Sequence, residues 1–136
     1  MSAYPRAGNL AAYQTVATHG GVAASDPHGL ILMLLDGAME RTAAARGFMA
    51  NHVFAEKGRL IGRVVAIVDE LRMSLDPVQG GELAKNLDAL YDYISRQLMR
   101  ANLENRTELL DEVTGLLKEI RAAWIAIPPE ARAGSK

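Results

Sequence analysis

Apolar residues recur with helical spacing from Asp26 to Phe48, and they form two stripes instead of one. Asp26 followed by Pro27 predicts a helix start, because the carboxylate can cap free backbone N–H groups and proline fits the first helical turn. One stripe comprises Leu30, Leu34, Ala38, Ala45 and Phe48, and the second comprises Leu32, Leu35, Met39 and Ala43. A helix that packs on one core needs one stripe. This helix is therefore either central in the fold or offers a face to a second polypeptide.

Three more helices are predicted, over about residues 54–75, 82–101 and 105–125. Each carries one complete apolar stripe, comprising Leu60, Val64, Ile67, Leu71 and Leu75, then Leu83, Leu87, Leu90, Ile94, Leu98 and Ala101, and finally Leu109, Val113, Leu116, Leu117, Ile120 and Trp124. Asp76-Pro77 and Gly80-Gly81 predict a break, and Asn105 with Glu108 three residues later predicts a cap for the last helix. Short connections favour an all-α, antiparallel up-and-down four-helix bundle over residues 26–127.

The two ends of the chain have a different composition. Residues 1–25 contain glycine, proline and small residues, and we expect a flexible arm with a short helix that carries Leu10, Tyr13 and Val16. Pro128-Pro129 ends the last helix, so residues 128–136 are predicted to be a disordered tail.

Charge and composition exclude several classes of protein. The 136 residues have a net charge of −1, so the chain lacks the basic charge that is typical of nucleic-acid binding. It contains no cysteine, which excludes thiol catalysis. The longest wholly apolar run, residues 30–35, is far shorter than the roughly 20 residues of a membrane span. No secretory signal pattern is present. We expect a cytoplasmic protein without nucleic-acid partners or membrane insertion.

Candidate catalytic groups are scarce. A di-iron bundle needs Glu-x-x-His pairs, and none of His19, His28 or His52 has a glutamate three residues earlier. No phosphate-binding loop or nucleophile motif occurs. A phosphorelay bundle would use His28 or His52, but neither is expected in the middle of a helix. The sequence therefore predicts no enzyme activity, metal or other cofactor.

The second stripe of the first helix remains the main functional signal. Exposed apolar area of this kind marks a partner site, so we expect Leu35 and Met39 to face away from the core. Alternatively, the N-terminal arm or a second copy of the chain covers this stripe. The competing function is accordingly a homodimeric helical adaptor.

Six segments together are similar to a known family. They read ASDPHGLI at 24–31, MLLDGA at 33–38, GGELA with NL at 80–87, LYDY at 90–93, ANLEN at 101–105 and AW at 123–124. In these segments the chain resembles the FliS family of flagellar export chaperones. Leu32 and Leu35 depart from the family pattern, in which these positions are often polar and aromatic, respectively.

The resemblance implies a chaperone that binds the disordered C-terminal segment of flagellin, prevents premature polymerisation and delivers it to the flagellar type III export apparatus. The client complex then docks on the export gate protein FlhA. In the family, an apolar residue followed by tyrosine three positions later serves this docking and can cover the client groove; Leu10 and Tyr13 match. For client binding we predict Leu32, Leu35, Met39, Ala43 and Tyr91, with a possible homodimer when client is absent.

Overall fold

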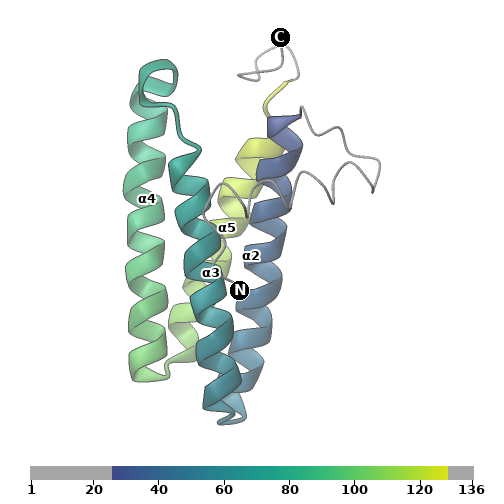
Figure 1. Ribbon diagram of the computed structural model, residues 1–136, viewed down its shortest axis with the longest axis vertical. Coiled ribbons are helices and arrows are strands. Elements are labelled where there is room, and N and C mark those ends of the chain that lie inside the picture. The colour runs from purple at the N-terminus through teal and green to yellow at the C-terminus, as the bar shows by residue number, and fades with distance from the viewer. Residues whose placement is uncertain (1–25, 129–136) are drawn as a thin grey trace, which may run out of the picture.

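The computed structural model describes residues 26–128, which form four helices (Figure 1). They are α2 (Pro27–Ala50), α3 (Phe54–Met73), α4 (Pro77–Glu104) and α5 (Thr107–Ile125). Each helix packs against the next along the chain, and α5 closes the bundle by packing against α2. Successive helices run in opposite directions (Figure 1). The predicted all-α, up-and-down four-helix bundle is confirmed.

Aspartate followed by proline begins two of the helices. Asp26 caps α2 by accepting a hydrogen bond from the Gly29 N–H at 3.3 Å. Asp76 caps α4 in the same way, accepting from the N–H groups of Val78 and Gln79. Both carboxylates satisfy backbone donors that have no partner within the helix. Helix α4 therefore starts at Pro77, earlier than the predicted residue 82.

A break in α4 separates its first turn from the rest of the helix. Gly81 has φ 52° and ψ −127°, a conformation that is available to glycine but strained for other residues. Leu83 lies two residues after this break, near the start of α4. Its side chain is 60% exposed, so the prediction that Leu83 belongs to the core is wrong.

The predicted cap of the last helix is also wrong. Asn105 adopts a left-handed conformation (φ 53°) and ends α4, and its N–H donates to the Ala101 carbonyl. Asparagine tolerates this conformation better than most residues and is a common helix terminator. Helix α5 begins after Arg106, whose side chain makes no capping hydrogen bond.

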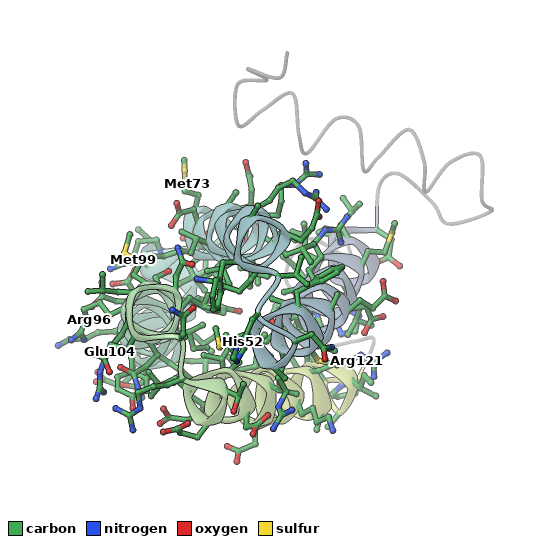
Figure 2. The ribbon with its side chains drawn as sticks, turned by 90° about the horizontal axis from the view of Figure 1, so that it is seen from below. His52, Met73, Arg96, Met99, Glu104 and Arg121 are labelled. Atoms are coloured by element: carbon green, nitrogen blue, oxygen red, sulfur yellow. The ribbon has the colours of Figure 1, made fainter. Side chains whose placement is uncertain are left out.

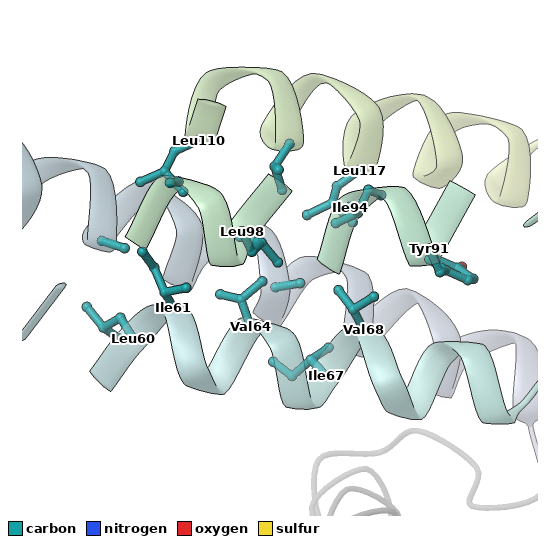
Figure 3. Packing of buried hydrophobic residues seen from close by; sticks show 14 of the residues in the cluster. Leu60, Ile61, Val64, Ile67, Val68, Tyr91, Ile94, Leu98, Leu110 and Leu117 are labelled. Atoms are coloured by element: carbon teal, nitrogen blue, oxygen red, sulfur yellow. The ribbon is translucent and has the colours of Figure 1, made fainter. Parts of the chain in front are cut away.

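The core runs along the centre of the bundle and takes residues from all four helices (Figure 3). Its fully buried members include Leu34, Leu35, Val64, Val68, Ile94, Leu98, Leu110, Val113 and Leu117. Thr42 is also fully buried, and its hydroxyl donates to the Ala38 carbonyl at 2.7 Å. This bond within the helix satisfies a polar group that would otherwise be costly to bury.

A reciprocal contact joins the start of α2 to the end of α5. The Trp124 indole N–H donates to the His28 carbonyl at 3.2 Å, and His28 Nε2 lies 2.7 Å from the Trp124 carbonyl oxygen. The two rings are stacked, with centroids 5.3 Å apart. His28 is therefore a buried structural residue near a helix end, which agrees with its expected absence from the middle of a helix.

We predict that Gly81→Ala lowers the free energy of unfolding by about 1–3 kcal/mol, because alanine is strained at this positive φ. Gly115→Ala in α5 is the matched control. A Cβ at Gly115 meets open space, so this variant should gain about 0.5–1 kcal/mol from helix propensity. Urea denaturation of both variants measures the difference, and equal stabilities would contradict the prediction.

Candidate interaction surface

Two predicted client-binding residues lie in the core. Leu35 is fully buried, so the expectation that it faces away from the core is wrong. Tyr91 is only 3% exposed and packs in the same core cluster (Figure 3). Burial raises the pKa of Tyr91 to about 12. Neither side chain presents a surface to another polypeptide in the folded bundle.

The two stripes of α2 are parts of one wide buried arc. Every helix of the bundle has two neighbours, but α2 packs more extensively against α3 and α5 than α4 does against α3 and α5, so its buried arc is broader. Leu34 and Leu35 are adjacent in sequence, about 100° apart around the helix, and both are buried. The apolar excess of α2 is thus explained largely by packing within the chain.

The remaining residues of the second stripe lie along the seam between α2 and α5. Leu32 and Met39 are partly buried and pack against the core, whereas Ala43 is exposed. Two ion pairs cross from α5 to the same side of α2, Arg121 to Asp36 and Arg46 to Asp111. Leu32 and Met39 therefore offer only part of their surface. The other two predicted site residues, Leu10 and Tyr13, lie outside the described residues.

A second group of exposed apolar side chains lies away from the α2–α5 seam. Near the Asn102 end of α4, the most exposed of these side chains belong to α3 and α4. Leu103 is 82% exposed, Met99 60% and Phe54 46%. On α3, the exposed or half-buried positions that follow Phe54 at intervals of four residues are small. We define the α3–α4 surface as Phe54, Gly58, Gly62, Ala66, Met99 and Leu103. In Figure 2, Met99 lies on the side of the bundle away from Arg121 and the α2–α5 seam.

The antiparallel register of α3 and α4 brings these residues together. A Cβ at Gly58 would lie 3.7 Å from Asn102 Oδ1, and Arg72 pairs with Asp88. Arg72 is fourteen residues after Gly58 and Asp88 is fourteen residues before Asn102, so both contacts belong to one antiparallel register. One helical turn from the Gly58–Asn102 contact, the same register places Gly62 opposite Leu98, the residue before Met99. A Cβ at Gly62 meets no atom within 4 Å. The surface is therefore a low strip on α3 beside two exposed apolar side chains on α4.

A buried lysine holds one end of this surface in place. Lys57 is 5% exposed, and its Nζ donates to the carbonyl oxygen of Asn102 at 2.9 Å and to Oδ1 of the same residue at 2.7 Å. The ammonium also lies 5.4 Å from the centre of the Phe54 ring, within cation–π range. The His52 ring also stacks on the Phe54 ring, with the two centroids 5.5 Å apart. These bonds fix Phe54 and the end of α4 relative to each other.

Charged residues limit the surface at its other end. Arg72 of α3 pairs with Asp88 and Asp92 of α4, and Arg96 also pairs with Asp92. The hydrogen bond from Arg72 lowers the pKa of Asp88. Along the helices, this ion-pair group separates Met99 and Leu103 from Met73, Val78 and Leu83, the exposed apolar residues toward the other end of α3 and α4. We therefore confine the α3–α4 surface to the half of the bundle near Asn102.

Two structural features were not found in the described part of the chain. Within residues 26–128, no cluster of three or more histidine, aspartate or glutamate side chains is placed to hold a metal ion. Among the same residues, no helix combines the length and apolar character that crossing a membrane requires. The α3–α4 surface, which offers apolar contact and no reactive group, is the site that the geometry supports.

Comparison with known proteins identifies the family. The family model described as flagellar protein FliS matches residues 9–131. The chain belongs to the FliS family. A flagellar secretion chaperone of Pseudomonas aeruginosa is 47% identical over 115 residues, covering 85% of this chain and 91% of the relative. The flagellar secretion chaperone of Salmonella typhimurium is 40% identical, and the match covers 92% of this chain and 93% of the relative. That of Vibrio cholerae is 38% identical, and the match covers 90% of each chain.

Membership places the chain in a chaperone family of flagellar export and not in an enzyme family. The sequence-based resemblance is therefore confirmed. Sequence reasoning did not select Met99 or Leu103, because neither falls on the apolar stripe of α4. The available signal was the four-residue spacing of Phe54, Gly58 and Gly62, which leaves one face of the FliS helix α3 without long side chains.

We predict that Leu35→Ala lowers the free energy of unfolding by about 2–5 kcal/mol, because it removes a fully buried side chain. Met39→Ala is the matched control on the same helix, and its partly exposed side chain should cost clearly less. Thermal or urea denaturation measures both. A Leu35→Ala protein as stable as Met39→Ala would show that Leu35 is not a core residue.

A second prediction concerns Glu112, which accepts hydrogen bonds from Tyr93 at 2.6 Å and Gln97 at 3.0 Å. These bonds lower its pKa below the ordinary 4.5. Its contribution to stability is therefore complete above about pH 4.5 and is lost as the pH falls through the folded-state pKa. Glu112→Gln should lose less stability than the wild type between pH 6 and pH 3 in urea denaturation. Glu119→Gln, on an exposed part of α5, should behave like the wild type.

Proposed function

We propose that this FliS chain is a cytoplasmic chaperone for the disordered C-terminal segment of flagellin. It prevents premature polymerisation of this client and delivers it to the flagellar type III export apparatus. The observation that carries the proposal is the exposed α3–α4 surface on a chain that belongs to a family of flagellar secretion chaperones. Exposed apolar residues that gather on one face are typical of a protein-binding site.

The shape of the α3–α4 surface suits a helical segment of the client. The open position at Gly62 allows a partner backbone to approach α3 closely. Met99 and Leu103, one turn apart on α4, then contact the apolar side of an amphipathic helix. A thioether adapts to varied partner side chains, so Met99 suits a client with several apolar residues.

A disordered client also explains why no chemistry or cofactor is needed. The client gains apolar contact when it folds onto the chaperone, and the entropy that it loses lowers the net affinity. This balance supports retention before export and release during export. The Lys57–Asn102 bonds serve the same purpose, because an ordered surface reduces the cost of binding on the chaperone side.

Other residues take additional roles in this proposal. Leu32, Met39 and Ala43 form a second, weaker contact along the α2–α5 seam. Leu35 and Tyr91 support the site from within the core and do not touch the client in the closed bundle. Leu10 and Tyr13 act in docking of the client complex on FlhA and in covering the client site.

We expect Leu103→Asp to weaken binding of a flagellin C-terminal peptide by about tenfold or more, because a charge replaces a largely exposed apolar contact. Helical content and thermal stability should stay unchanged, since Leu103 is outside the core. Val78→Asp is the control, because Val78 is 90% exposed but lies near the start of α4. Calorimetry measures affinity, and circular dichroism measures folding.

Sedimentation of the same proteins distinguishes the homodimeric adaptor. A stable dimer that ignores the peptide would overturn the chaperone proposal. Binding that is equally strong for the wild type, Leu103→Asp and Val78→Asp would keep the chaperone function but remove the α3–α4 surface from it.

A further inference from the structure

The methionines of the described chain differ strongly in exposure. Met73 is 65% exposed and Met99 60%, whereas Met49 is 2% exposed. Met33 and Met39 are intermediate. A methionine thioether is oxidised when an oxidant reaches its sulfur, so oxidation should follow this order of exposure. The bundle thus contains two accessible thioethers and one protected internal reference.

Met99 differs from Met73 in its surroundings. Met99 lies within the α3–α4 surface, one turn from Leu103, and both side chains are exposed. Met73 lies at the other end of α3, beyond the ion pairs that Arg72 makes with Asp88 and Asp92. In Figure 2, which looks along the bundle, Met73 and Met99 both lie on its outside, on the side away from Arg121. A chemical change at Met99 therefore acts on the candidate client site.

We propose that Met99 is an oxidation site through which a peroxide lowers client binding. A sulfur lone pair attacks one peroxide oxygen, so an S–O bond forms as the O–O bond breaks. The sulfur loses two electrons, and hydrogen peroxide gains them. The departing hydroxide takes up the proton of the transferred oxygen and leaves as water. The product is methionine sulfoxide, which sulfoxide reductases convert back to methionine.

The effect on binding follows from the polarity of the sulfoxide. Its oxygen is a strong hydrogen-bond acceptor that water satisfies while Met99 is exposed. A client helix that covers Met99 with its apolar side removes this water and offers the sulfoxide oxygen no hydrogen-bond donor in its place. Burial of an unsatisfied polar group is unfavourable. The bundle itself keeps its stability, because Met99 is outside the core cluster.

This inference rests on the proposed client function, and its test separates the two. The full chain is treated with limiting hydrogen peroxide and mapped by peptide mass spectrometry. Met99 and Met73 should be oxidised well before Met49. Calorimetry with a flagellin C-terminal peptide should then show affinity about five- to tenfold weaker for oxidised wild type than for untreated protein. Circular dichroism should show unchanged helical content.

Two leucine variants assign the effect to one sulfur. Met99→Leu keeps an apolar side chain and should retain its affinity after peroxide treatment, whereas Met73→Leu should lose affinity as the wild type does. Oxidation of Met99 no faster than that of Met49, or equal losses in both variants, would overturn the inference. Unchanged affinity after complete oxidation of Met99 would overturn it while leaving the chaperone function intact. Absence of peptide binding by untreated protein would overturn both.

Discussion

The packing of α2 against both α3 and α5 is the constraint on which the rest of the structure depends. Because α2 packs against its two neighbours more extensively than any other described helix does, it buries a wide arc that includes Leu34, Leu35 and Thr42. This arc takes up most of the apolar residues that appeared to be in excess. The His28–Trp124 contact and the Asp36–Arg121 ion pair then hold α2 to α5 along the same seam. The free apolar surface is consequently displaced to the opposite side, on α3 and α4.

The sequence predicted the bundle well because its main signals are local. Apolar spacing along each helix, Asp26-Pro27 and the break at Asp76-Pro77 all act within a few residues. The family was predicted as well, since its matching segments extend over most of the chain. The error at Asn105 has a local cause of a different kind. Asparagine serves equally well to begin a helix or to end one in a left-handed conformation, and the three-residue spacing to Glu108 favoured the wrong choice.

The candidate site was less predictable because exposure depends on how the helices face one another. Helical spacing separates Leu35 from Leu34 by about 100°, but it does not state how broad the buried arc is. Conversely, the apolar spacing along α4 includes Leu83, but this residue is exposed because the helix is interrupted at Gly81. Leu103 and Met99 become a common surface with Gly62 only through the register of α3 against α4, which is a property of the folded chain.

Glycine alone does not mark this surface. Gly62 and Gly115 both lie in helices beside open space, and each costs helix stability relative to alanine. Gly62, however, lies one helical turn from Gly58 on the α3–α4 surface, and Gly58 borders the Asn102 side chain that Lys57 holds in position. A helix face without side chains is useful for binding when exposed apolar side chains lie beside it and hydrogen bonds hold the neighbouring residues in place. Gly58 and Gly62 meet these conditions, so their cost in helix stability is consistent with a surface kept accessible for a partner.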